Sequence, residues 1–369
     1  MSRVHLGDVA IEHKETCKED KSMYPIVGLE HLTPEQITLQ NWDLNTENTF
    51  TKVFRKGNIL FGRRRAYLKK AAVAPFDGIC SGDITVIEAK EDKIIPELLP
   101  FVIQNDDLFD FAVGKSAGSL SPRVKWTHLQ NYEFELPDKQ KQHELAKVLW
   151  AIEDTRKSYQ QLIKRTDELV KSQFIELFYG KGYPVKTIGD VIDKNIIRVG
   201  KVFEKTDSIQ YLDISSIDNT SKTVIGLTPY ALADAPSRAQ YVLKQNDIMY
   251  STVRPNLQNF AINPYSDENV VGSTGFCVLR CIGVTTGYIW GVINSIPFTE
   301  AMVNQASGAN YPAVTDKVVH AYEIPIPPEN EQNAYDELVR QSDKSKFELN
   351  RALDELTATY KQIIKDNLG

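Results

Sequence analysis

Two long stretches of the chain repeat apolar residues at alternating intervals of three and four, with Arg156 and Thr166 interrupting the first stretch. This spacing predicts two helices, each with a single apolar stripe of the coiled-coil type. Gly180 and Gly182 indicate where the first helix ends. At ~1.5 Å per residue, a helix of about 38 residues spans on the order of 57 Å. The apolar positions are Leu145, Leu149, Ile152, Tyr159, Ile163, Val170, Phe174 and Leu177 in the first stretch, and Tyr335, Leu338, Leu349, Leu353, Leu356, Tyr360 and Ile363 in the second.

The rest of the sequence alternates short β-rich runs with shorter helical segments, which predicts α/β (α+β) globular domains. Strands are expected at 59–62, 83–89, 209–214, 247–252 and 275–281, and a helix near 96–104. The expected organisation is a first globular domain over 1–136, a helix over 137–180, a second globular domain over 181–326 and a second helix over 327–369.

The chain contains the same module twice. A proline-containing hinge precedes each long helix, EFELPDKQKQ at 133–142 and EIPIPPENEQ at 323–332. Upstream, KGNILFGRRRAYLKKAAVAPF (56–76) matches QNDIMYSTVRPNLQNFAINPY (245–265). The two hinges lie 190 residues apart. A repeat of this length is too long for a solenoid, so it indicates a duplicated globular domain with its helix. Shorter matches join 6–9 with 188–191 and 27–32 with 212–217.

Duplication of this kind predicts pseudo-twofold symmetry between the two copies. The second helix would then run back along the first, and the two would pack antiparallel through their stripes and hold the globular domains apart. The alternative, in which each helix packs only on its own domain, is weaker because a long helix with one apolar stripe needs a partner along its length. Two related domains on one chain also imply a target with two parts.

Composition places the chain among globular proteins, with 42 % hydrophobic and 25 % charged residues. No stretch approaches the ~18 uninterrupted apolar residues of a membrane span, and the N-terminal sequence MSRVHLGDVAIEHKE has no signal-peptide pattern. The four cysteines, Cys17, Cys80, Cys277 and Cys281, show no C-x-x-C pair and fit a reducing compartment. These features predict a cytoplasmic protein without a zinc site.

Charge is unevenly distributed along the chain. The net charge of −6 argues against nucleic acid as a partner, but residues 48–76 hold eight basic residues and no acidic one. A solvated surface face is the competing interpretation of such a cluster. The second copy is less basic and offers polar side chains of the types that bind base edges and phosphates. The DNA-binding candidates are Arg63, Arg64, Arg65, Lys69 and Lys70 in the first copy, and Arg254, Asn256, Gln258 and Asn259 in the second.

Two matched loops, SAGSLSPRVKW (116–126) and ASGANYPAVTDK (306–317), are rich in glycine and serine. They could bring backbone N–H groups and polar side chains to DNA, or they could merely turn the chain. Their candidate residues are Ser119, Ser121, Arg123, Asn310 and Tyr311.

Familiar catalytic motifs are absent, since the chain has no phosphate-binding loop, no G-x-G-x-x-G, no H-E-x-x-H and no G-x-S-x-G. No catalytic residue and no metal ligand are therefore assigned. Two other classes stay open. One is a two-domain scaffold that does not bind DNA, and the other is a metal-dependent nuclease built on Asp77, Glu88 and Lys90.

In the order of its motifs, the whole chain resembles the specificity subunits of type I restriction–modification systems. The likeness rests on the two hinges, on DELVKSQFIELF (167–178) and DELTATYKQII (354–364), and on the matched segments 56–76 and 245–265. The first hinge departs from the pattern, because LPDKQKQ (136–142) lacks the second proline and the glutamate.

This resemblance implies a subunit without catalytic activity, in which each globular domain recognises one half of a bipartite DNA target and the paired helices set the spacer between the halves. It also implies partners: double-stranded DNA, two methyltransferase subunits that use S-adenosylmethionine to methylate adenine, and motor-nuclease subunits that use ATP and Mg. No cofactor is expected on this chain itself.

Overall fold

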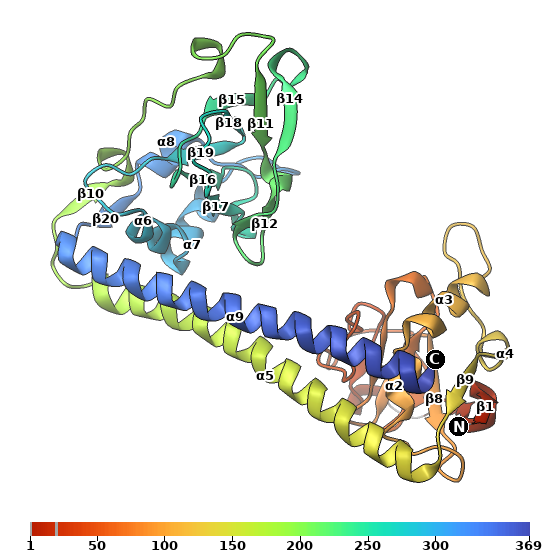
Figure 1. The fold of residues 1–369 in the computed structure, drawn as a ribbon. Coiled ribbons are helices and arrows are strands. Elements are labelled where there is room, and N and C mark those ends of the chain that lie inside the picture. Colours follow the sequence, from red (N-terminus) through yellow and green to blue (C-terminus); the bar gives the residue numbers. More distant parts are fainter. Residues whose placement is uncertain (1, 19–20) are drawn as a thin grey trace. The chain divides into compact units, whose positions relative to one another are not determined.

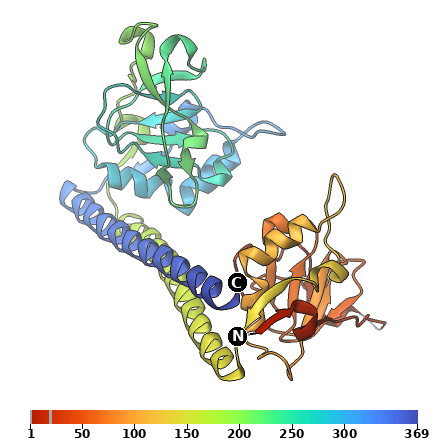
Figure 2. The same cartoon turned by 45° about the vertical axis from the view of Figure 1, so that its right-hand side comes forward.

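The computed structural model describes residues 2–18 and 21–369. The chain forms two compact units, one that joins Met1–Gln161 with Leu349–Gly369 and one that comprises Leu162–Glu348. Each unit therefore holds one globular domain with part of each long helix, and both ends of the chain belong to the first unit (Figures 1 and 2). The four-part division expected from the sequence stays a prediction, because the units divide each long helix between them.

Unit 1 is built around β5, the buried strand ILFG. Successive side chains of a strand point to opposite faces, so Ile59 and Phe61 enter one hydrophobic core and Leu60 enters another. The elements of the domain are β1 (Ser2–His5), α1 (Leu6–Val9), β2 (Ala10–Glu12), β3 (Ile26–Val27), β4 (Lys52–Phe54), β5 (Ile59–Gly62), β6 (Ala71–Val73), β7 (Gly78–Cys80), β8 (Ile84–Ala89), α2 (Leu99–Ile103), α3 (Asp106–Gly114), α4 (Trp126–Leu129) and β9 (Glu133–Leu136).

These strands form a four-stranded sheet in the order β2-β8-β5-β6, a three-stranded sheet β3-β7-β4 and a two-stranded pair β1-β9. All neighbours are antiparallel except β3 and β7. Leu6, Phe101 and Phe134 from the surrounding segments fill the larger core beneath β5. The predicted mixed α/β class is thus confirmed for this domain.

Unit 2 repeats this arrangement around β16. Ile248 and Tyr250 enter one core and Met249 the other, as in β5. The elements are β10 (Val185–Thr187), β11 (Ser208–Leu212), β12 (Ile217–Asp218), β13 (Thr223–Val224), β14 (Thr228–Ala231), β15 (Ala239–Val242), β16 (Ile248–Ser251), β17 (Phe260–Ile262), β18 (Val270–Ser273), β19 (Phe276–Leu279), α6 (Thr286–Ile293), α7 (Ile296–Gln305), α8 (Asp316–His320) and β20 (Glu323–Pro325).

Strand pairing confirms the internal duplication. The sheet β17-β16-β19 of unit 2 corresponds to β6-β5-β8 of unit 1, and the register pair Tyr250–Phe260 lies 189 residues beyond the pair Phe61–Ala71. The pair β10-β20 likewise corresponds to β1-β9. The order β11-β18-β15 matches β3-β7-β4, with the first pair parallel and the second antiparallel in both, so that unit 2 adds only β14 and the hairpin β12-β13.

The two predicted long helices are α5 (Lys139–Phe178) and α9 (Glu329–Leu368), each of 40 residues. In unit 2 they are antiparallel, since Asp167 of α5 pairs with Lys346 of α9 at 2.7 Å whereas Phe174, further along α5, packs on Tyr335, further back along α9. The Phe174 ring also contacts Tyr288 of α6, which lies between the sheets and the helices of this unit (Figure 1). Within unit 2 the helices therefore pack both on each other and on the domain, two arrangements that the sequence left as alternatives.

In unit 1 the same helices meet near the other end of α5. The Arg156 guanidinium lies 5.7 Å from the ring of Tyr360 in α9, which in turn packs against Phe101 of the domain. None of the helices described here is both long and apolar enough to cross a membrane.

Candidate nucleic-acid interface

A short 3-10 turn, η2 (Ala66–Leu68), presents the basic cluster of unit 1. Arg65 and Lys69, which flank it, both adopt left-handed backbone conformations with φ of 54° and 50°. Such conformations cost of order 1 kcal/mol for residues other than glycine and persist only where surrounding contacts hold them. Those contacts are the Arg65 N–H, which donates to the Pro122 carbonyl at 2.8 Å, and the Lys69 ammonium, which pairs with Asp106 at 2.6 Å.

The loop that follows α3 packs against this turn. Ala117 and Arg123 exchange backbone hydrogen bonds of 3.0 and 2.9 Å across it, and Gly118 has the positive φ of 115° that the tight bend requires. Arg64 pairs with the loop through its backbone bridge to Arg123 and through its guanidinium, which donates to the Ser121 hydroxyl at 3.0 Å. Residues 63–70 and 116–123 thus form one surface, called here the turn-and-loop surface of unit 1.

Asp83 lies among the cations of this surface. Arg123 donates to it at 2.7 Å and Arg64 lies 3.5 Å away. The Arg123 hydrogen bond, together with the charges of Arg123 and Arg64, lowers the pKa of the Asp83 carboxyl, although partial burial opposes the shift. The carboxylate therefore stays ionised at neutral pH. It neutralises part of the positive charge of Arg64 and Arg123, two residues that the sequence predicted to bind DNA.

The remaining candidate residues of unit 1 differ in their exposure and in their hydrogen-bond partners. Arg65 and Ser119 are exposed. Lys70 donates to the Leu29 carbonyl at 2.8 Å and so faces its own domain. Arg63 is partly buried, its carbonyl accepts from Val124, and its Nε lacks a hydrogen-bond partner within residues 2–18 and 21–369.

Unit 2 builds the same surface from residues 252–259 and 306–313. Its turn η7 (Pro255–Leu257) lies between Arg254 and Gln258, which are left-handed with φ of 52° and 49°. The Arg254 N–H donates to the Pro312 carbonyl at 2.7 Å, and Ser307 and Ala313 exchange hydrogen bonds of 3.0 and 2.9 Å around a bend at Gly308. Matched pairs of non-glycine residues thus keep the left-handed backbone in both copies.

Side chains on this second surface differ from those on the first. The Arg254 guanidinium lies 4.7 Å from the ring of Tyr311 and 3.4 Å from the Asn310 carbonyl. Gln258 donates to the Thr299 hydroxyl at 2.7 Å, which fastens the turn to α7. Asn256 and Asn310 are exposed, whereas the side-chain oxygen of Asn259 is buried and has no partner in the part of the chain described.

Lys222, in the turn of the β12-β13 hairpin, is a contributor that the sequence analysis missed. Its ammonium donates to the Gln258 carbonyl and lies 4.8 Å from the Phe260 ring. Burial, followed by the charge of Lys171, lowers the pKa of Lys222 to about 8. Lys222 therefore supports the unit 2 turn from beneath.

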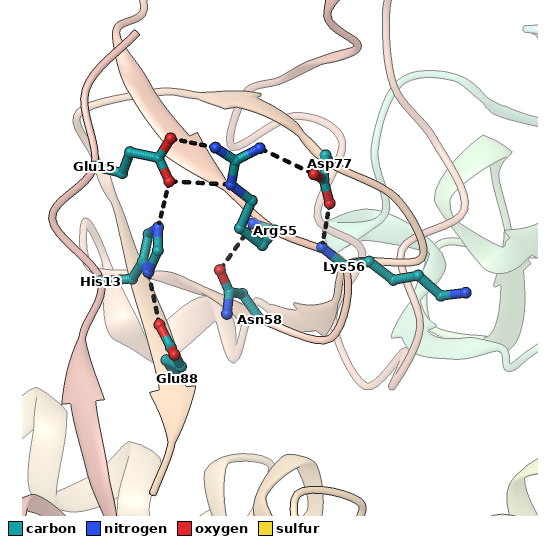
Figure 3. A network of polar contacts seen from close by, with 7 residues as sticks. All are labelled: His13, Glu15, Arg55, Lys56, Asn58, Asp77 and Glu88. Atoms are coloured by element: carbon teal, nitrogen blue, oxygen red, sulfur yellow. Dashed lines mark hydrogen bonds and ion pairs between the residues drawn. The ribbon is translucent and has the colours of Figure 1, made fainter.

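The residues of the nuclease alternative do not converge. His13 links Glu88 at 2.6 Å to Glu15 at 3.2 Å, and Arg55 links Glu15 to Asp77 (Figure 3). Asp77 and Glu88 thus stand at opposite ends of a network that supplies each with a cationic or donor partner, while Lys90 donates to the Gly7 carbonyl. Across residues 2–18 and 21–369, no group of three His, Cys, Asp or Glu side chains is arranged so that it could hold a metal ion. The geometry favours a structural network over a metal site.

A known protein family matches this chain twice, once in each half. The family described as "Type I restriction modification DNA specificity domain" matches residues 3–165 and 180–357. The Type I restriction enzyme EcoDI specificity subunit of Escherichia coli is 28 % identical over 132 residues, which cover 35 % of this chain and only 29 % of that protein.

Two solved structures establish the fold. One comes from work on complex assembly and conformational transition of the type I R-M system, with a TM-score of 0.57, 19 % identity, and coverage of 99 % of this chain and 97 % of that one. The other is the type I restriction–modification S subunit from M. genitalium, with a TM-score of 0.58, 12 % identity, and coverage of 100 % and 96 %. Because the family match spans both turn-and-loop surfaces, the chain belongs to the type I restriction–modification DNA specificity family, whose members are recognition subunits and not catalysts.

Proposed function

We propose that each turn-and-loop surface recognises one half of a bipartite double-stranded DNA target, so that the chain selects the sequence on which a type I complex acts. The observation that carries this proposal is the repeated pair of strained residues, Arg65 with Lys69 and Arg254 with Gln258, each pair held beside a glycine-hinged loop. Exposed arginine supplies phosphate contacts or a bidentate contact to guanine. Different side chains on the same backbone frame would let the two domains choose different sequences.

The proposal includes the partners. Two methyltransferase subunits and the motor-nuclease subunits would assemble on this chain in the cytoplasm, and they would bring the S-adenosylmethionine, ATP and Mg chemistry. Support comes from family membership and from exposed apolar side chains on the long helices, among them Leu162, Leu169 and Phe347. Leu162 and Leu169 lie seven residues apart on α5 and so share a face of that helix, where a partner could cover both.

The direct test is a map of methylated adenines in cells that carry this chain with its methyltransferase. We expect one asymmetric sequence in two halves, separated by a spacer of fixed length. Exchanging residues 1–136 for the first domain of another family member should change one half only. A methylation pattern in which both halves changed together would contradict independent recognition by two domains.

A further inference from the structure

Leu120 lies at the tip of the unit 1 loop and is 89 % exposed. Both of its neighbours along the chain are polar, and it contributes to none of the hydrophobic cores of the described residues. A single exposed leucine is ordinary on a protein surface. Leu120 differs from an ordinary exposed leucine because hydrogen bonds and an ion pair hold the loop that carries it.

The loop beneath Leu120 is fastened at several points. The Ala117–Arg123 backbone pair closes it, Arg123 is fixed by Asp83, and Ser121 accepts from Arg64. The carbonyl of Pro122 is held by the Arg65 N–H. These bonds keep the leucine pointing away from its own domain, and such preorganisation lowers the entropy lost when the side chain is buried in a partner.

The charge around the tip selects the kind of partner. Arg64 and Arg123 hold the loop and share the carboxylate of Asp83, and Arg65 is bonded to the loop through Pro122. Some DNA-binding proteins insert an apolar side chain between two base pairs and unstack them, while nearby cations hold the phosphates. This surface is therefore suited to duplex DNA, with Leu120 entering the base stack.

Unit 2 carries a different side chain on the equivalent loop. Its tip is Asn310–Tyr311, where Tyr311 is 69 % exposed and its ring lies under the Arg254 guanidinium. A tyrosine braced by arginine offers a flat face for stacking on a base. The two loops thus share a backbone, and each exposes one large apolar side chain near its tip, Leu120 in unit 1 and Tyr311, at the position of Ser121, in unit 2.

We propose that the two loop tips insert into the DNA, Leu120 between base pairs of one half-site and Tyr311 against a base of the other. This inference rests on the proposed DNA recognition and adds the way in which the target is deformed. The sequence preference would then include the ease with which a particular base step opens, in addition to contacts with base edges.

The test places 2-aminopurine in turn at each position of both half-sites, because its fluorescence rises when a base unstacks. The full chain is assembled with its methyltransferase, and the methylated adenine itself is left out of the comparison since base flipping gives its own signal. We expect Leu120→Ala to abolish the rise in one half-site and to weaken binding about tenfold. Tyr311→Ala should do the same in the other half-site only, and Leu120→Met should keep the rise.

Leu44→Ala serves as the matched control, since Leu44 is an exposed leucine of the same unit outside the turn-and-loop surface. It should leave both fluorescence and affinity unchanged. Tight binding with no unstacking in the wild type, or unstacking that survives Leu120→Ala, would overturn insertion while leaving DNA recognition intact. Loss of methyltransferase assembly in the Leu120→Ala variant without DNA would overturn it too, because the tip would then contact protein. Absence of any DNA binding would instead refute the proposed function.

Discussion

The charge on the unit 1 surface can be tested by the salt dependence of DNA binding. Arg65 is exposed on its strained turn, whereas Arg64 and Arg123 share Asp83 and Lys69 pairs with Asp106. Arg65 is therefore the cation of this group most available to a phosphate. Arg65→Gln should remove one phosphate contact and keep the turn, because glutamine adopts the left-handed conformation in unit 2, at Gln258, which matches Lys69.

The expected magnitude follows from counterion release. Each phosphate contact contributes about 0.9 to the slope of log K against log salt, so the Arg65→Gln slope should be shallower by about 0.9. Between 50 and 200 mM salt, this difference changes the ratio of wild-type to variant affinity by roughly 3.5-fold. Asp83→Asn should act in the opposite direction, since it releases Arg64 and Arg123 from their shared carboxylate and lets them approach phosphates.

Fluorescence anisotropy of a labelled target duplex with the assembled methyltransferase measures both slopes. Lys164→Gln, which removes an exposed charge from α5, is the control and should leave the slope unchanged. If Arg65→Gln keeps the wild-type slope and Asp83→Asn weakens binding, the turn does not face DNA and Asp83 serves only to hold the loop. The assignment of this surface would then be wrong.

Three further predictions concern the frame that carries the two surfaces. Phe174→Ala should lower the free energy of unfolding by ~3–5 kcal/mol in urea denaturation because Phe174 is fully buried, whereas Leu177→Ala, at a half-exposed position, should cost far less. The lowered pKa of Lys222 means that the unfolded chain binds more protons above pH about 8, so stability should rise with pH from there toward 10.5, and Lys222→Met should remove that rise. Four residues inserted after Lys157 lengthen α5 by ~6 Å and should lengthen the spacer in the methylation map; an unchanged spacer with full activity would mean that the helix does not set it.

The regular elements were predictable because their patterns are local. ILFG is a strand at the four residues expected, and each long helix begins inside its proline-containing hinge, at Lys139 or at Glu329. The pattern could not show how far each stripe would be buried. Leu149 and Phe174 are fully covered because a domain packs there as well, while Ile163 between them stays half-exposed. Heptad spacing records only which residues share a face.

The candidate site was predictable as a set of segments but not as a set of free charges. Matching 56–76 with 245–265 found both turns, since Arg65 recurs as Arg254 and Leu68 as Leu257. Sequence does not show that Lys69 is paired with Asp106 or that Lys70 faces the Leu29 carbonyl, because such contacts depend on how distant segments pack. Lys222 was missed for the same reason, since it lies 36 residues before the Gln258 carbonyl that it supports.

The two hinges keep the same geometry although their sequences differ at Asp138 and Pro328. Gln142 and Gln332 occupy matched places, each 2 % exposed, and each accepts from a backbone N–H of its own domain while donating to a hinge proline carbonyl. These glutamines fix the direction in which each helix leaves its domain. Where the second hinge has Pro328 before its helix, the first has Asp138, whose carboxylate accepts from the Lys141 N–H at 2.9 Å as a helix cap. The missing proline is thus replaced by a cap, and the two hinges position their helices through the same buried amide.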